Sequence, residues 1–97
     1  MSTFIVLLDF TDQGIRNVYD SPHRADRFNE MAAQRGARIA AQYWTTGSHD
    51  GVLILEAPSD EVAASILISL AQEGYVRTTT LRAFDWAEAK ELIEGNS

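Results

Sequence analysis

Two adjacent residues in a predicted turn, His49 and Asp50, are the strongest candidates for acid–base chemistry in this sequence. An imidazole oriented by a carboxylate is the usual arrangement of a general base. Neighbouring residues of an extended chain point in opposite directions, so the two side chains meet only if the chain turns between them. The structural alternative is a hairpin loop at residues 47–51, in which the Asp hydrogen-bonds its own backbone.

Polar side chains near the end of the chain are the strongest candidates for ligand binding. Alternate residues of a strand share a face, so Thr78, Thr80 and Arg82 form one set, and Arg77 and Thr79 form the other. A guanidinium clamps a carboxylate or an enolate, and threonine hydroxyls donate to a substrate oxygen. We expect the first set to face away from the helices and to line a ligand cavity.

These residues, and the aromatic pair formed by Tyr43 and Trp44, also have a plain structural explanation. Threonine favours strands, and Arg82 has acidic candidates for an ion pair in Asp9 and Glu56. Tyr43 and Trp44 project to opposite faces, so one packs beneath the helices and the other meets a second sheet or a ligand. Trp44 is the candidate that we place beside the ligand.

We expect no metal site and no cofactor. The chain has no cysteine and two histidines, His23 and His49, which lack a recognised ligand spacing to Asp60 or Glu61. Haem would need a buried proximal histidine, and His23 is expected in the exposed first turn of a helix.

Composition restricts the class of protein. A chain of 97 residues with 45% hydrophobic content predicts a single domain over residues 1–97. Fourteen acidic and eight basic residues give a net charge of -6, which repels phosphate backbones and argues against nucleic-acid binding. The apolar run at residues 4–8 is too short to span a membrane and has no basic flank, so we expect a soluble cytoplasmic protein with no membrane segment.

Apolar periodicity and turn residues predict the element order β-α-β-β-α-β-α. The predicted strands are residues 3–10, 37–45, 52–55 and 75–84. Helices are expected to begin at an N-cap Ser21, at an N-cap Ser59 and at a capping box of Asp85 with Glu88, whereas residues 11–20 are expected to be a loop. This order predicts an α+β, ferredoxin-like βαββαβ fold with a C-terminal helix.

The first and third predicted strands are apolar on both faces, although the helices cover only one. An uncovered apolar patch of several hundred Å² favours association at roughly 25 cal/mol per Å². We therefore expect a face-to-face homodimer, with higher oligomers left open, around a partly polar space that holds a small organic molecule.

Four segments of the sequence resemble the GYD family, because they occur in the same order and with similar spacing as in that family. They are FTDQGIRN at 10–17, YWT at 43–45, GSHD at 47–50 and VRTTTLRAF at 76–84. The resemblance implies a bacterial or archaeal dimeric α+β barrel of ferredoxin-like protomers, and it implies no established reaction. The Gly-Tyr-Asp signature aligns with Gly47 or its neighbour, His49 and Asp50, so histidine stands where the family has tyrosine.

Two functions fit these features. The first is a cofactor-independent enzyme that binds and converts a small organic molecule between paired sheets. Its catalytic residues would be His49 and Asp50, and its ligand-binding residues would be Trp44, Thr78, Thr80 and Arg82. The second is a non-catalytic dimeric ligand-sensing or assembly module. It is favoured by the wide apolar stripe of the second long helix, where Ala64, Ile68 and Ala71 indicate contacts beyond one core.

Overall fold

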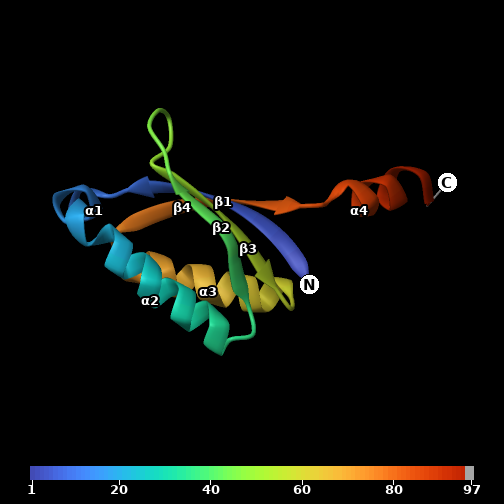
Figure 1. Cartoon of the computed structure of the whole chain (residues 1–97), viewed down its shortest axis with the longest axis horizontal. Coiled ribbons are helices and arrows are strands. Elements are labelled where there is room, and N and C mark those ends of the chain that lie inside the picture. Colours follow the sequence, from blue (N-terminus) through green and yellow to red (C-terminus); the bar gives the residue numbers. More distant parts are fainter. Residues whose placement is uncertain (96–97) are drawn as a thin grey trace.

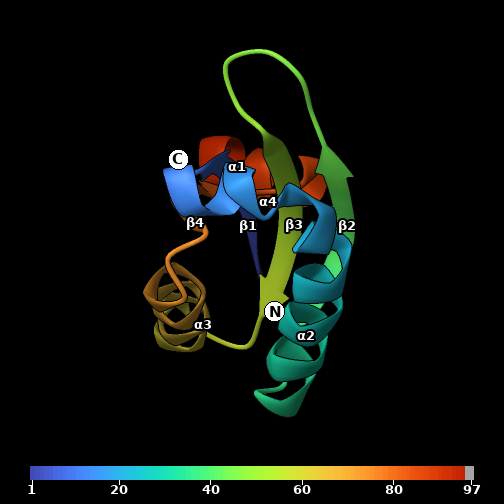
Figure 2. The same cartoon turned by 90° about the vertical axis from the view of Figure 1, so that its left-hand side faces the viewer.

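The computed structural model describes residues 1–95, which form a four-stranded antiparallel sheet with two long helices on one face (Figure 1, Figure 2). The strands are β1 (Ser2–Phe10), β2 (Arg38–Trp44), β3 (Gly51–Ala57) and β4 (Val76–Ala83), in the spatial order β2-β3-β1-β4. The helical elements are α1 (Asp12–Arg16), the 3-10 turn η1 (Val18–Asp20), α2 (Ser21–Gln34), α3 (Asp60–Gln72), α4 (Trp86–Lys90) and the π-helical turn η2 (Glu91–Gly95). The predicted ferredoxin-like α+β fold is confirmed, with the two most apolar strands at the centre of the sheet.

The core lies between the sheet and the helices α2 and α3. Even-numbered residues of β1 and odd-numbered residues of β3 face these helices. The largest fully buried side chains are Val6, Leu53, Leu55 and Ile66. Each such burial stabilises the fold by about 1.5–3 kcal/mol, so the helix-facing side of the two central strands holds the protomer together.

The start of α3 follows the sequence signal, but the start of α2 does not. The Val62 N–H donates to Ser59 Oγ at 3.2 Å, as an N-cap serine requires. The prediction that Ser21 caps α2 is wrong, because Ser21 is already helical and Asp20 stands at the N-cap. Since η1 ends at Asp20, this residue is helical rather than extended (φ -87, ψ -3), and its side chain makes no capping bond.

The predicted loop over residues 11–20 is wrong, because residues 12–16 form α1 and residues 18–20 form η1. Thr11 caps α1 by accepting the Gly14 N–H at 3.0 Å, and its hydroxyl donates to the Gly74 carbonyl at 2.6 Å. A Cβ on Gly14 would lie 1.9 Å from the Tyr75 carbonyl oxygen. The glycine that reads as a loop signal is therefore required by the close approach of α1 to the start of β4.

The predicted capping box at the C-terminal helix is confirmed. The Glu88 N–H donates to Asp85 Oδ1 at 2.8 Å, and the Asp85 N–H donates to Glu88 Oε1 at 3.0 Å. The helix α4 and the turn η2 project from the end of β4, away from the body of the protein (Figure 1). This projection contributes to the elongated dimensions of 51 × 31 × 18 Å.

Candidate functional site

The sheet face opposite α2 and α3, here called the open face, is apolar at its centre. It carries the odd-numbered residues of β1 and β4 and the even-numbered residues of β3. Its apolar side chains are Ile5, Leu7, Ala41, Tyr43, Val52, Ile54, Leu81 and Ala83. Tyr43 is 62% exposed and Leu81 is 49% exposed in the protomer. The expectation that the sheet is apolar on both faces is confirmed.

Charged groups stand at both ends of the open face. At one end, Arg38 Nε donates to Glu56 Oε1 across β2 and β3. At the other end, Asp9 lies opposite Arg77 in the register of β1 and β4. The open face therefore has an apolar centre between two polar ends, as interfaces with a hydrophobic core and a polar rim have.

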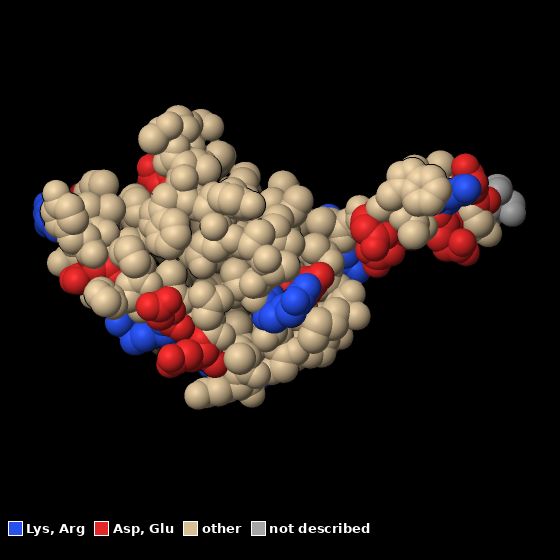
Figure 3. All heavy atoms as spheres, viewed as in Figure 1, with Lys and Arg blue, Asp and Glu red and all other residues tan. Residues whose placement is uncertain are grey.

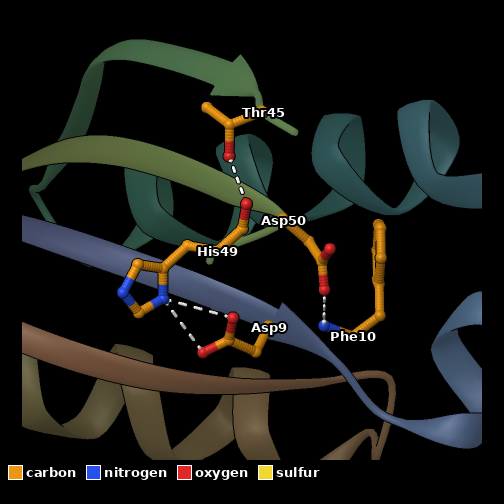
Figure 4. A network of polar contacts seen from close by, with 5 residues as sticks. All are labelled: Asp9, Phe10, Thr45, His49 and Asp50. Atoms are coloured by element: carbon orange, nitrogen blue, oxygen red, sulfur yellow. Dashed lines mark hydrogen bonds and ion pairs between the residues drawn. The ribbon is translucent and has the colours of Figure 1, made fainter. Parts of the chain in front are cut away.

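His49 pairs with Asp9 and not with Asp50 (Figure 4). Its Nδ1 lies 3.2 Å from each carboxylate oxygen of Asp9, and the two side chains are 37% and 40% exposed. The Asp50 carboxylate instead accepts the Phe10 N–H at 2.8 Å, and the Asp50 N–H donates to the Leu8 carbonyl at 2.8 Å. The structure thus does not bring the two predicted catalytic residues together, and Asp50 ties the loop to β1.

The loop between β2 and β3 covers a shallow hollow of about 340 Å³ on the open face. The Thr45 hydroxyl donates to the His49 carbonyl at 2.7 Å, and the Thr45 N–H donates to the Asp50 carbonyl at 2.9 Å, which closes the loop. The hollow is lined by Leu7, Thr45, Thr46, Ser48, His49, Gly51 and Val52. It combines an apolar floor from the sheet with hydroxyl groups and one imidazole from the loop.

The predicted ligand set on β4 faces the helix side of the sheet. The register places Thr78 on the same side as Thr80, which lies opposite the core residue Val6. The expectation that Thr78, Thr80 and Arg82 face away from the helices is therefore wrong. Val76, at the start of the same alternate set, is buried against the core and fixes the orientation of the whole strand.

Arg82 binds the end of its own sheet rather than an acidic side chain. Its guanidinium donates to the Thr3 carbonyl at 3.3 Å, to Ser2 Oγ at 3.2 Å and to the Ala83 carbonyl. Its Cζ lies 4.4 Å from the centroid of the Phe84 ring. The alternative partners Asp9 and Glu56 are paired with His49 and Arg38 instead.

A β-bulge in β2 redistributes its side chains between the two faces. The register shifts between Ile39 and Ala41, so Arg38 lies on the open face and Trp44 on the helix side. Trp44 Nε1 donates to Ser21 Oγ at 2.9 Å at the start of α2. Tyr43 and Trp44 do point to opposite faces, as predicted.

Small crevices lie on the helix side near Trp44. Their volumes are about 50 and 40 Å³, and both are lined by Leu8, Ser21, Gln42 and Val76. Spaces of this size hold a few water molecules, whereas pockets for organic ligands are typically about 300–1,000 Å³. Among these spaces, the hollow beside His49 is therefore the better candidate for an organic ligand.

Residues 1–95 contain no group of three or more His, Cys, Asp or Glu side chains arranged to hold a metal ion. His23 is exposed on α2, as expected. Within the same range, no helix has the length and the hydropathy to cross a membrane.

Asp9 is the site residue that the sequence analysis missed as a partner for His49. Its position on the same alternate set as Ile5 and Leu7 was the available signal.

Comparisons with known proteins agree along nearly the whole chain. The GYD domain family matches residues 4–93. A Thermus thermophilus protein named "Glutamine synthetase and cystathionine beta-lyase binding protein" is 37% identical over 89 residues, which are 91% of this chain and 94% of that protein. The crystal structure of TTHA0845, also from Thermus thermophilus, is similar with a TM-score of 0.55 and 26% identity, and the match covers 88% of this chain and 95% of that chain.

Proposed function

This chain belongs to the GYD domain family, and from that premise we propose that it is a homodimeric, non-catalytic binding protein that docks on a metabolic enzyme. One observation carries the proposal: the relative that is 37% identical is named for binding glutamine synthetase and cystathionine β-lyase. We therefore propose enzymes of these two kinds as partners. The geometry does not join the two residues predicted to be catalytic, because the Asp50 carboxylate accepts the Phe10 N–H and His49 contacts Asp9 instead.

The open face is the surface that we propose for a second copy. Its apolar centre is only half-buried in one protomer, and removing apolar area from water contributes roughly 25 cal/mol per Å². Closed two-fold pairing uses the same surface on both copies, so a self-complementary flat sheet suits it.

The outer surface of α3 is the surface that we propose for the enzyme. Ala64, Ile68 and Ala71 are exposed there at helical spacing, and Ile68 is 66% exposed. Arg35 Nη1 borders this stripe, donating to Ser65 Oγ at 3.3 Å and to Ser69 Oγ at 3.2 Å. Because α3 lies on the other side of the sheet from the open face, this stripe stays accessible when two sheets pair (Figure 2).

Calorimetry with purified glutamine synthetase and cystathionine β-lyase from the organism that supplies this chain tests the proposal. We expect saturable binding to at least one enzyme, and we expect Ile68→Glu to weaken it at least tenfold by placing a charge in the contact. Tyr19→Glu is the matched control, because Tyr19 is 94% exposed and lies outside α3. Failure of the wild-type protein to bind either enzyme contradicts the function. Equal weakening by both variants removes α3 as the surface.

A second candidate function is favoured by the hollow beside His49. Its 340 Å³ lie on the open face, so a second sheet laid on that face would cover it and enclose a small organic molecule. In this alternative the protein binds that molecule, and His49 with Asp9 transfers a proton without a cofactor. Mass spectrometry of the small molecules released from the denatured protein tests it. A stoichiometric compound present in the wild type and absent in His49→Ala is expected, and its absence from the wild type counts against a ligand.

A further inference from the structure

The end of the chain forms a C-terminal arm, residues 84–95, that leaves the body of the protein. The helix α4 continues directly into η2 as one helical segment over residues 86–95, and among the described residues this segment has few contacts with other helices and strands. Figure 3 shows the arm as a separate lobe joined to the body by a narrow neck. Beyond the contact of Arg82 with the Phe84 ring at its base, the arm extends away from the sheet and the long helices (Figure 1).

Large apolar side chains on the arm are exposed. Trp86 is 78% exposed and Ile93 is 79% exposed. Both line one hollow of about 320 Å³, together with Ala89, Lys90 and Glu94. Tryptophan is enriched among the residues that contribute most of the binding energy at protein interfaces.

A helix as short as α4 needs external packing to persist. It has five residues and continues into the five residues of η2, and isolated helices shorter than about 12–15 residues are marginal in water. Its capping box contributes about 1 kcal/mol, which does not offset the cost of nucleation. Packing on a further surface would stabilise the arm.

We propose that the arm of each protomer packs on the body of a second copy of this chain and completes the dimer interface. The inference rests on the dimer of the proposed function. Four strands of about seven residues make a sheet face on the order of 500 Å² per copy, or about 1,000 Å² for the pair. Stable interfaces bury about 1,200–2,000 Å² in total, and each buried aromatic adds about 150–250 Å². Two arms therefore supply the area that the sheets alone lack.

Charge argues against the arm of a second copy as the occupant. The arm carries Asp85, Glu88, Glu91 and Glu94 against Lys90, a net charge of -3, so two arms packed on each other would repel. The rest of the chain carries ten acidic residues and seven arginines, also a net charge of -3, so the contact on the body of the second copy is made by the apolar side chains of the arm rather than by its charge.

Sedimentation equilibrium of the Trp86→Ser/Ile93→Ser double variant tests the arm. We expect the dimer dissociation constant to rise at least tenfold, with unchanged circular dichroism because the arm lies outside the core. Tyr19→Ser is the control, since Tyr19 is also highly exposed but lies on η1, outside the arm, the open face and α3, and we expect it to leave the constant unchanged.

Fluorescence of Trp86 in a Trp44→Phe background gives a second readout, because the chain has two tryptophans. We expect its emission to shift to the blue as the concentration rises through the monomer–dimer transition. A dimer with a solvent-exposed Trp86 overturns the arm proposal and leaves the dimer intact. A blue-shifted Trp86 in the monomer, or a shift seen only when an enzyme partner is added, also overturns it. A wild-type protein that stays monomeric at all concentrations overturns both the arm and the homodimer.

Discussion

The Asp50 carboxylate and backbone together bind two residues of β1, Phe10 and Leu8, and thereby anchor the loop between β2 and β3. A side chain that satisfies a backbone N–H at the end of a sheet removes a donor that would otherwise lack a partner. The family resemblance aligns the last residue of the Gly-Tyr-Asp signature here, and this bond gives that aspartate a structural reason. His49, by contrast, makes a half-buried side-chain contact with Asp9.

Replacing Asp50 should therefore destabilise the fold more than replacing His49. We expect Asp50→Ala to lower the free energy of unfolding by about 1–3 kcal/mol, because the Phe10 N–H loses its acceptor. We expect His49→Ala to cost about 0–1 kcal/mol, the range for exposed ion pairs. Urea unfolding monitored by circular dichroism measures both. Asp50→Asn, which keeps a carbonyl acceptor, should recover part of the loss. Unfolding free energies in the reverse order would refute the anchoring role.

At the scale of elements, the junction of β1, α1 and β4 depends on Gly14, because this position has no room for a side chain. A Cβ at Gly14 would overlap the Tyr75 carbonyl, which is fixed backbone and cannot move aside as a flexible side chain can. Overpacking of this kind costs about 1–3 kcal/mol. We expect Gly14→Ala to lower the free energy of unfolding in urea by at least that amount, while Gln13→Ala, an exposed neighbour on the same helix, changes it little. A Gly14→Ala variant as stable as Gln13→Ala would contradict the close approach.

The elements that could be predicted are those with local signals. Ser59 and the Asp85–Glu88 box each mark a helix start by residues that lie within one turn of each other. The two central strands each carry an uninterrupted apolar run, at residues 4–8 and 52–55. The orientation of β4 could not be predicted, because polar residues occupy both alternate sets and only the burial of Val76 decides between them. The bulge in β2 could not be predicted either, because one extra residue in a strand does not change the pattern of apolar and polar residues in a recognisable way. The pairing of His49 with Asp9 joins residues 40 positions apart, which no local pattern reveals.

At the scale of the whole molecule, the protein has two unequal sides. The helix side buries the core and presents the α3 stripe, whereas the open face and the C-terminal arm expose apolar groups that the protomer itself does not cover. A dimer that hides the open face doubles the number of α3 stripes on one particle. Two linked binding surfaces engage an oligomeric enzyme with greater avidity than one, if their spacing matches.

A charge at the centre of the open face should therefore separate the two proposed interactions, which are the pairing of two copies and the binding of an enzyme through α3. Ile54 is half-buried on β3 and belongs to the apolar centre, so Ile54→Lys places an ammonium group where a second sheet must pack. Burying that charge without a partner costs several kcal/mol in the dimer, whereas the lysine of a monomer extends into water. We expect sedimentation equilibrium to show a folded monomer at concentrations where the wild type and Ile68→Lys are dimeric. The Ile54→Lys monomer should still bind the enzyme through α3, but more weakly as avidity is lost. An Ile54→Lys protein that dimerises with the wild-type dissociation constant would show that the open face is not the interface.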